Sequence, residues 1–318
     1  MPFLDTIKID QFINSLNVQI PSKEKFLQLG YIFPISPRYF KTIGKSKCPI
    51  VNYERGILLY SLIAKYKPKN VLEIGTAEGY SALCMAWAMT DYNINGRIFT
   101  IDPKPFDVPV EREITWEENP KHKTVMLSTK ELWNKFANKE WIKKIEVLTG
   151  FSSEVLQKKT EEFPKMDMGF IDGHHRYEAV IHDFYAFLQT ASENFSLLFD
   201  DYTTNENKDV AKVIHEEIVP NFDVTLIRTN AKQQRKEIGE SNIKKYHDRI
   251  IQPATDLYIC WMESRSLKKP LREIYSKSKS DQIISKYLKW EKRWKLRKTL
   301  NTKIPLLGKF RFSLTKST

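Results

Sequence analysis

Cysteine is scarce in this sequence. The 318 residues include only Cys48, Cys84 and Cys260, and these three lie far apart in the chain. No C-x-x-C pair is present, so neither a zinc knuckle nor a dithiol redox site is indicated. An odd number of isolated cysteines is typical of reduced thiols in the cytoplasm, and we interpret each one as a small buried apolar side chain.

Long apolar runs are also missing. Hydrophobic residues make up 41% of the chain, enough for one full-sized core, but no run is long enough to cross a bilayer. The N-terminal segment MPFLDTIKIDQF lacks the pattern of a signal peptide. We therefore expect a cytoplasmic protein, with peripheral contact to the inner face of a membrane as an open alternative.

Acidic residues are scarce in the C-terminal part. Residues 265–318 contain 17 Lys+Arg and 3 Asp+Glu, and their net charge of 17 − 3 = +14 exceeds the net charge of +12 of the whole chain. Within this part, residues 280–300 predict an amphipathic helix with an aromatic stripe and a basic face. The stripe consists of Ile283, Tyr287, Trp290 and Trp294, and the basic residues are Lys286, Lys289, Lys292 and Arg293.

Such a helix suits the surface of an anionic membrane. The stripe could equally pack on the protein's own core or on the second subunit of a homodimer. Nucleic acid binding is disfavoured, because the rest of the chain has no positive charge balance to match.

The middle of the chain alternates between short apolar runs and helical patterns, which is typical of a doubly wound α/β sheet with mostly parallel strands. Two insertions, at 103–141 and 230–255, interrupt the alternation, and segments of this length are usually functional or disordered. The predicted strands are 71–74, 97–101, 145–148, 168–171, 196–199, 224–227 and 257–261, and the predicted helices are 53–66, 80–89, 153–158, 178–189 and 209–218.

These patterns divide the chain into three expected parts. Residues 1–52, in which Pro21, Pro34, Pro37 and Pro49 break any long helix, form an N-terminal cap or lid with one or two short helices. Residues 53–264 form the α/β domain, and residues 265–318 form a basic helical extension.

The stretch NVLEIGTAEGYSAL combines a strand, a glycine turn and a helix. Glycines allow the backbone to turn sharply and allow a ligand to approach main-chain N–H groups. The spacing of Gly75 and Gly79 is neither that of a dinucleotide fingerprint nor that of a phosphate loop. Glu73 at the strand end suits a ligand that carries an amino group.

Polar residues follow the ends of the next strands. Asp102, after the strand 97–101, is placed to accept hydrogen bonds from ribose hydroxyls. Gly150, Phe151 and Ser152 follow the third strand and could flank a purine. The fourth strand ends in Asp172, within FIDGHHRYEAV, and further acids follow the fifth strand in LLFDDYTT.

Together these motifs resemble class I S-adenosylmethionine-dependent methyltransferases, and more narrowly the cation-dependent O-methyltransferases that act on catechols or sugars. The resemblance covers about residues 53–264 and implies a Rossmann-like sheet of seven strands, with the final two forming the antiparallel pair. It implies that Glu73, Gly75 and Ser81 hold the methionine part of the cofactor and that Asp102 holds its ribose. The full set of candidate cofactor residues is Glu73, Gly75, Thr76, Gly79, Ser81, Asp102, Ser152 and Asp172.

Asp172, Asp200 and Asp201 should converge, because neighbouring parallel strands end side by side. Three clustered carboxylates repel one another, and a divalent cation relieves this repulsion. Oxygen ligands favour Mg²⁺, with Mn²⁺ or Ca²⁺ as alternatives. In the resembling family, the metal ligands occupy these three positions.

Methyl transfer to oxygen also requires removal of a hydroxyl proton, which suits histidine. His174 is favoured by strand alternation, because it shares the face of Asp172. His175 is the competing candidate, and neither position matches the residue type of the resembling enzymes.

The expected function is therefore O-methyl transfer to a small molecule or glycan, such as a sugar or a phenolic natural product. A nicotinamide-dependent oxidoreductase and a non-catalytic cofactor-binding scaffold are the alternatives. The acceptor and the oligomeric state are not specified by the sequence.

Overall fold

A computed structural model describes residues 4–33, 40–43, 46–49, 53–114, 123–159, 162–203, 208–230 and 257–303. Its centre is an eight-stranded sheet with the strand order β1-β11-β12-β10-β9-β4-β5-β8. Strand β12 runs antiparallel to both of its neighbours, and the other pairings are parallel. The strands are β1 (Asp5–Lys8), β4 (Asn70–Ile74), β5 (Arg97–Asp102), β8 (Ile145–Thr149), β9 (Met166–Ile171), β10 (Ala191–Tyr202), β11 (Phe222–Arg228) and β12 (Tyr258–Leu267).

All seven predicted strands are confirmed, and the last two form the expected antiparallel pair. They were predictable because strands buried on both faces have nearly continuous apolar sequences. The sheet nevertheless has eight strands rather than seven, because β1 pairs in parallel with β11 at one edge. The N-terminal segment is thus not simply a cap, since residues 5–8 belong to the sheet.

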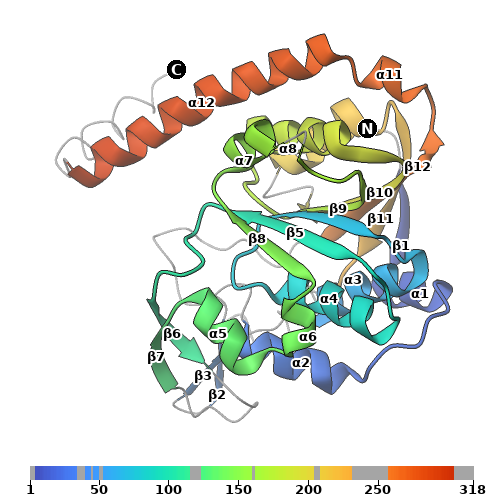
Figure 1. Cartoon of the computed structure of the whole chain (residues 1–318). Helices are drawn as coiled ribbons and strands as arrows, with labels where there is room; N and C mark the ends of the chain where they lie inside the picture. Colours follow the sequence, from blue (N-terminus) through green and yellow to red (C-terminus); the bar gives the residue numbers. More distant parts are fainter. Residues whose placement is uncertain are drawn as a thin grey trace.

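Helices cover both faces of the sheet, as Figure 1 shows. One face packs against α1 (Ile9–Ser15), α3 (Tyr53–Tyr66) and α4 (Tyr80–Asp91), and α2 (Lys23–Ile32) lies outside them. The other face packs against α8 (Tyr177–Thr190) and α9 (Lys208–Val213), which continues into the π-helical turn η1 (Ile214–Ile218). Consecutive strand residues divide between the two cores, as the pleat requires: Val71 faces the first core and Leu72 the second.

The described part of the first insertion lies beside the glycine turn. It contains the hairpin of β6 (Val110–Ile114) and β7 (Lys123–Leu127), followed by α5 (Thr129–Phe136) and α6 (Lys139–Ile142). A second small hairpin, β2 (Phe40–Ile43) with β3 (Ser46–Pro49), precedes α3. The second predicted insertion lies almost entirely outside the described residues.

The C-terminal extension contains α11 (Leu271–Ile274) and the long helix α12 (Lys277–Lys303), which crosses α8 and extends past α7 (Ser152–Lys159). The predicted aromatic stripe of α12 packs against the protein itself, because Tyr287 is buried and its ring stacks on His182 of α8 with a centroid separation of 4.4 Å. Among the described helices, none is long and apolar enough to span a membrane.

Candidate functional site

The turn between β4 and α4 is the sharpest feature at the carboxyl edge of the sheet. Gly75, Ala77 and Gly79 have φ values of +105°, +48° and +90°, so every second residue is left-handed. A Cβ on Gly75 would lie 2.1 Å from the carbonyl oxygen of Asp172, and one on Gly79 would lie 2.0 Å from the ring of Trp133. The two glycines are therefore required by backbone conformation and by contact with the protein, beyond any approach of a ligand.

Glu73 lies beneath this turn and has no exposed surface. Its carboxyl group accepts hydrogen bonds from the hydroxyls of Ser81 and Thr100. Burial raises the pKa of Glu73 to about 8. The structure thus places Glu73 and Ser81 together as predicted, but it places the carboxyl group below the turn.

Asp102 connects the ends of two strands. Its Oδ2 accepts from the N–H of Ala77 at 2.8 Å, and its Oδ1 accepts from the N–H of Lys104 at 2.8 Å. Thr76 is buried in the same turn, and its hydroxyl lies 2.5 Å from that of Thr100. The predicted residues of β4 and β5 therefore form one hydrogen-bonded unit around the turn.

Ser152, predicted to flank a purine, begins α7. Its hydroxyl donates to Oδ1 of Asp183 at 2.6 Å, and the same carboxylate oxygen lies 2.9 Å from Nδ1 of His182. These three side chains are buried. Asp183 is thus both buried and paired with His182.

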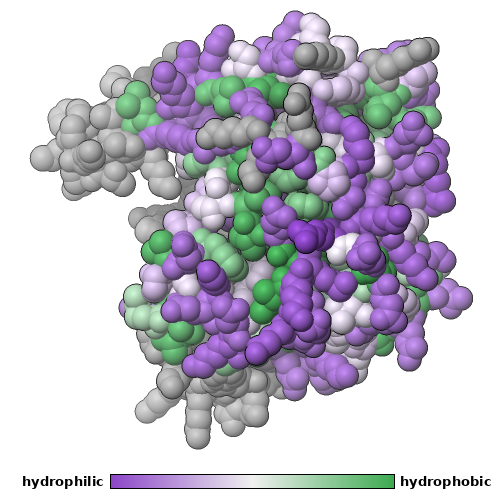
Figure 2. Space-filling view, viewed as in Figure 1, coloured by the Kyte–Doolittle hydropathy of each residue, from purple (hydrophilic) through white to green (hydrophobic). Residues whose placement is uncertain are grey.

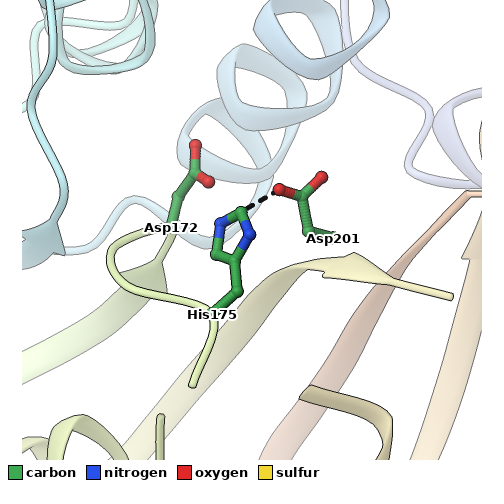
Figure 3. A group of neighbouring side chains, drawn as sticks. All are labelled: Asp172, His175 and Asp201. Carbon is green, nitrogen blue, oxygen red and sulfur yellow. Dashed lines mark ion pairs between the residues drawn. The ribbon is translucent and has the colours of Figure 1, made fainter. Parts of the chain in front are cut away.

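The predicted acids at the ends of β9 and β10 do meet, together with one histidine. Ligand atoms of Asp172, His175 and Asp201 lie within 4.8 Å of one another. Nε2 of His175 is 3.1 Å from Oδ2 of Asp201, and Figure 3 shows the imidazole between the two carboxylates. Burial and the charge of Asp201 raise the pKa of Asp172 to about 6, although Arg55 opposes this shift.

Asp200 does not belong to this cluster, which corrects the predicted set of three carboxylates. Its side chain is 1% exposed and forms an ion pair with Nη2 of Arg55. Successive side chains in a strand point to opposite faces of the sheet. The backbone of Asp201 is also left-handed, with a φ of +56°, at the point near the end of β10 where the pairing register with β12 shifts. The backbone thus sends the two neighbouring acids in different directions.

Arg55 is the residue that the sequence analysis missed. Nη1 of Arg55 also lies 2.9 Å from Oδ2 of Asp172, so one guanidinium bridges Asp172 and Asp200. It supplies part of the charge compensation that was assigned to a metal. A signal was present, because Arg55 shares a helical stripe with Leu58 and Leu62 and is therefore a charged residue on the buried face of α3.

The two histidines have different surroundings. His174 is exposed, and its Nδ1 accepts a hydrogen bond from the N–H of Arg176 at 3.2 Å, so the neutral ring carries its proton on Nε2. Partial burial and the neighbouring His175 lower the pKa of His174. Its ring packs against Trp290 and Trp294 of α12, at centroid distances of 5.5 and 5.8 Å. His174 therefore faces α12, whereas His175 faces the acids.

Comparison with known proteins gives one family. Residues 72–202 match the family model described as a methyltransferase domain, and this segment runs from the glycine turn through both acids of the cluster. No curated protein sequence matches the chain. The matched segment is therefore similar to a methyltransferase domain, and it spans the strands from β4 to β10 of the central sheet.

Several solved structures have a similar chain path. The O-methyltransferase from Bacillus cereus in complex with SAH has 15% identity and a TM-score of 0.46, covering 80% of this chain and 96% of that one. TomG from Streptomyces achromogenes, an O-methyltransferase involved in tomaymycin synthesis, has 17% identity and a TM-score of 0.45, and the match covers 80% of this chain and 95% of TomG. A putative O-methyltransferase from Klebsiella pneumoniae has 13% identity and a TM-score of 0.43, and the match covers 80% of this chain and 94% of that one. At these scores we use none of them to assign residues.

Proposed function

We propose that this chain transfers the methyl group of S-adenosylmethionine to a hydroxyl oxygen of a small molecule or glycan. The observation that carries this proposal is the meeting of Asp172, His175 and Asp201 at the carboxyl edge, beside the glycine turn. Oxygen is a poor nucleophile while it holds its proton, and this cluster offers both carboxylates and an imidazole with which to remove it.

The cofactor is expected at the turn between β4 and α4. Asp102 at the end of β5 is the candidate for the ribose, as in other sheets that bind nucleotides at this edge. Glu73 supports the turn by accepting hydrogen bonds from Ser81 and Thr100, so we assign it a structural role there. We expect it to interact with the amino group of the cofactor only at a distance.

For the proton transfer we favour His175 over His174. Nε2 of His175 lies 3.1 Å from Oδ2 of Asp201, so this carboxylate stabilises the ring after it takes up a proton. His174 instead uses Nδ1 to accept from the backbone, so it would lose that bond on becoming a base. Asp201 thus stabilises the imidazolium of His175, which is one role of the aspartate in a catalytic triad.

As an alternative to a role of His175 as the base, the same three side chains fit a divalent cation. Two carboxylate oxygens and one imidazole nitrogen are a ligand set that suits Mn²⁺ better than Mg²⁺, which prefers oxygen ligands only. When bound there, a cation would supply Lewis-acid polarisation of the acceptor oxygen. Arg55 already offsets Asp200 and part of Asp172, so the cation would neutralise only the charge that remains at Asp172 and Asp201.

Calorimetric titration with S-adenosylhomocysteine tests the cofactor, and titration with Mn²⁺ and Mg²⁺ tests the cation. We expect cofactor binding, Mn²⁺ binding at least about tenfold tighter than Mg²⁺, and loss of the Mn²⁺ signal in Asp201→Asn. His174→Gln is the matched control for His175→Gln: the latter should weaken Mn²⁺ by about tenfold or more and the former should not. A protein that binds no S-adenosylhomocysteine would overturn the proposed function. Equal effects of the two histidine variants would remove His175 from the site.

A further inference from the structure

The orientation of α12 is fixed by contacts along its length. The amide of Gln189 donates to the hydroxyl of Ser280 at 2.7 Å, near the start of the helix. Further along, the hydroxyl of Ser153 donates to Oε2 of Glu291 at 2.9 Å, and Glu291 is only 4% exposed. Together with the stacking of Tyr287 on His182, these contacts determine which side of α12 faces solvent.

The side that faces solvent is strongly basic. Between positions 282 and 296 it presents Lys286, Lys289, Lys292 and Arg293, all exposed, and we call these four residues the basic face of α12. The single acid in that span, Glu291, points inward to Ser153. Within the described part of the chain, no ion pair joins any of the four to an acid. Figure 2 shows mainly hydrophilic side chains along the upper border of the molecule, where α12 lies in Figure 1.

An apolar side chain continues this basic face. Leu296 is 60% exposed and follows Lys292 by four residues, so the two are neighbours on the helix surface. Cations next to the exposed side chain of Leu296 match a surface that is anionic outside and apolar inside, which is the chemistry of a bilayer and not of a phosphodiester backbone.

We propose that the basic face of α12 binds the surface of an anionic phospholipid membrane and holds the enzyme there. The binding is electrostatic, with Leu296 adding apolar contact. The aromatic stripe does not enter the lipid, because it is engaged with α8 and with His174. A helix with its side chains is about 10–12 Å wide, so the candidate site beside Trp290 would lie roughly one helix width from the lipid headgroups.

The test is vesicle sedimentation of the full chain with phosphatidylcholine vesicles, with and without phosphatidylserine. We expect binding only to the vesicles that contain phosphatidylserine, and weaker binding as salt is raised. Replacing the four basic residues of α12 by Gln should weaken binding by roughly 600-fold, because each cation near an anionic surface contributes about fivefold. These side chains are exposed, so the thermal unfolding midpoint should not change.

The matched control removes the same charge elsewhere. Lys130, Lys135, Lys139 and Lys143 are exposed on α5 and α6, on the opposite side of the molecule in Figure 1. Their replacement by Gln should leave vesicle binding nearly unchanged. Equal losses in the two variants, or no binding by the unaltered protein, would overturn the proposal. So would stronger binding to duplex DNA than to the anionic vesicles in a competition assay, since that result assigns the basic face to nucleic acid. The substitutions are preferable to deletion of residues 280–318, because deletion would also expose the surface of α8 that Tyr287 covers.

Discussion

The two halves of the carboxyl edge treat their carboxyl groups differently. We call the ends of β4 and β5, where we propose that the cofactor binds, the cofactor half. Here Glu73 and Asp102 receive hydrogen bonds from hydroxyls and backbone N–H groups of the protein itself. We call the ends of β9 and β10, where we propose that the methyl group is transferred, the chemical half, and here Asp172 and Asp200 share one guanidinium and Asp201 is paired with an imidazole. Fixed neutral donors thus hold Glu73 and Asp102, whereas charged partners hold the three aspartates. Glu78 in the glycine turn is a further acid of the first half, and it is paired with Lys104 and Arg112.

This difference suits the two tasks. A cofactor pocket needs one geometry, and backbone donors provide it without titrating near neutral pH. A site that accepts a proton or a cation needs groups whose charge can change, and the raised pKa of Asp172, at about 6, shows such a group. Substitutions around Asp172 and Asp200 should therefore act through charge, and those at the glycines of the turn through shape.

Arg55→Leu is expected to have the largest effect. It removes the guanidinium between Asp172 and Asp200. Removal of one partner of a buried ion pair typically lowers the free energy of unfolding by about 3–5 kcal/mol. Urea unfolding measures the loss. Asp200→Asn added to Arg55→Leu should recover part of it, because the pair is coupled and the effects are not additive. A loss under about 1 kcal/mol would mean that water, rather than Arg55, compensates these acids.

Gly79→Ala should have the next largest effect and should act through shape. The new methyl group would overlap the ring of Trp133 in a residue with φ of +90°, so we expect a loss of about 2–4 kcal/mol. Trp133 also donates to the carbonyl of Glu78 at 2.8 Å, so the first insertion should loosen from the turn. Tryptophan fluorescence during urea unfolding reports both changes.

Gly173→Ala is the matched control for that substitution. Its added Cβ would meet Ile74 at 3.2 Å and Oδ2 of Asp183 at 3.6 Å, without a left-handed φ. It should cost clearly less than Gly79→Ala. Equal costs would show that the contact with Trp133 does not determine the choice of glycine at position 79.

The sheet was largely predictable because its strands are buried. Strand β1 escaped prediction, since DTIK has one partly buried residue among exposed ones and gives no apolar run. It is an edge strand, and its place beside β11 depends on a pairing partner more than 200 residues away. Short local patterns carry no information about such a pairing.

The site was predictable only where it follows from strand ends. Asp172 and Asp201 end neighbouring parallel strands, so their proximity follows from the topology. The error at Asp200 arose because the left-handed backbone of Asp201 cannot be read from LLFDDYTT. Arg55 was missed because it comes from α3, far from Asp172 in the sequence, and helix patterns do not show which strand end a side chain will reach.

At pH 5, where Glu73 is protonated, Glu73→Gln should have the smallest effect, and its pH dependence tests whether Glu73 really depends on neutral donors. Glu73 has a pKa raised to about 8 by burial, against an ordinary value of 4.5, so the folded protein holds this proton more tightly than the unfolded chain does. The contribution of the protonated group to stability is therefore complete below about pH 4.5 and is lost as the pH rises through about 8. The loss is at most about 1.4 kcal/mol per pH unit.

Glutamine keeps the shape and cannot ionise, so the variant should gain stability relative to the unaltered protein as the pH rises from 5 to about 8. Only the difference between the two curves is diagnostic, because Asp172 also has a raised pKa and contributes a slope to both. Urea unfolding at several pH values measures this difference. Parallel curves would mean that Glu73 is already ionised in the folded state, held by Ser81 and Thr100. In that case the cofactor half would contain a buried charge as well, and the contrast between the two halves would lie only in the kind of donor.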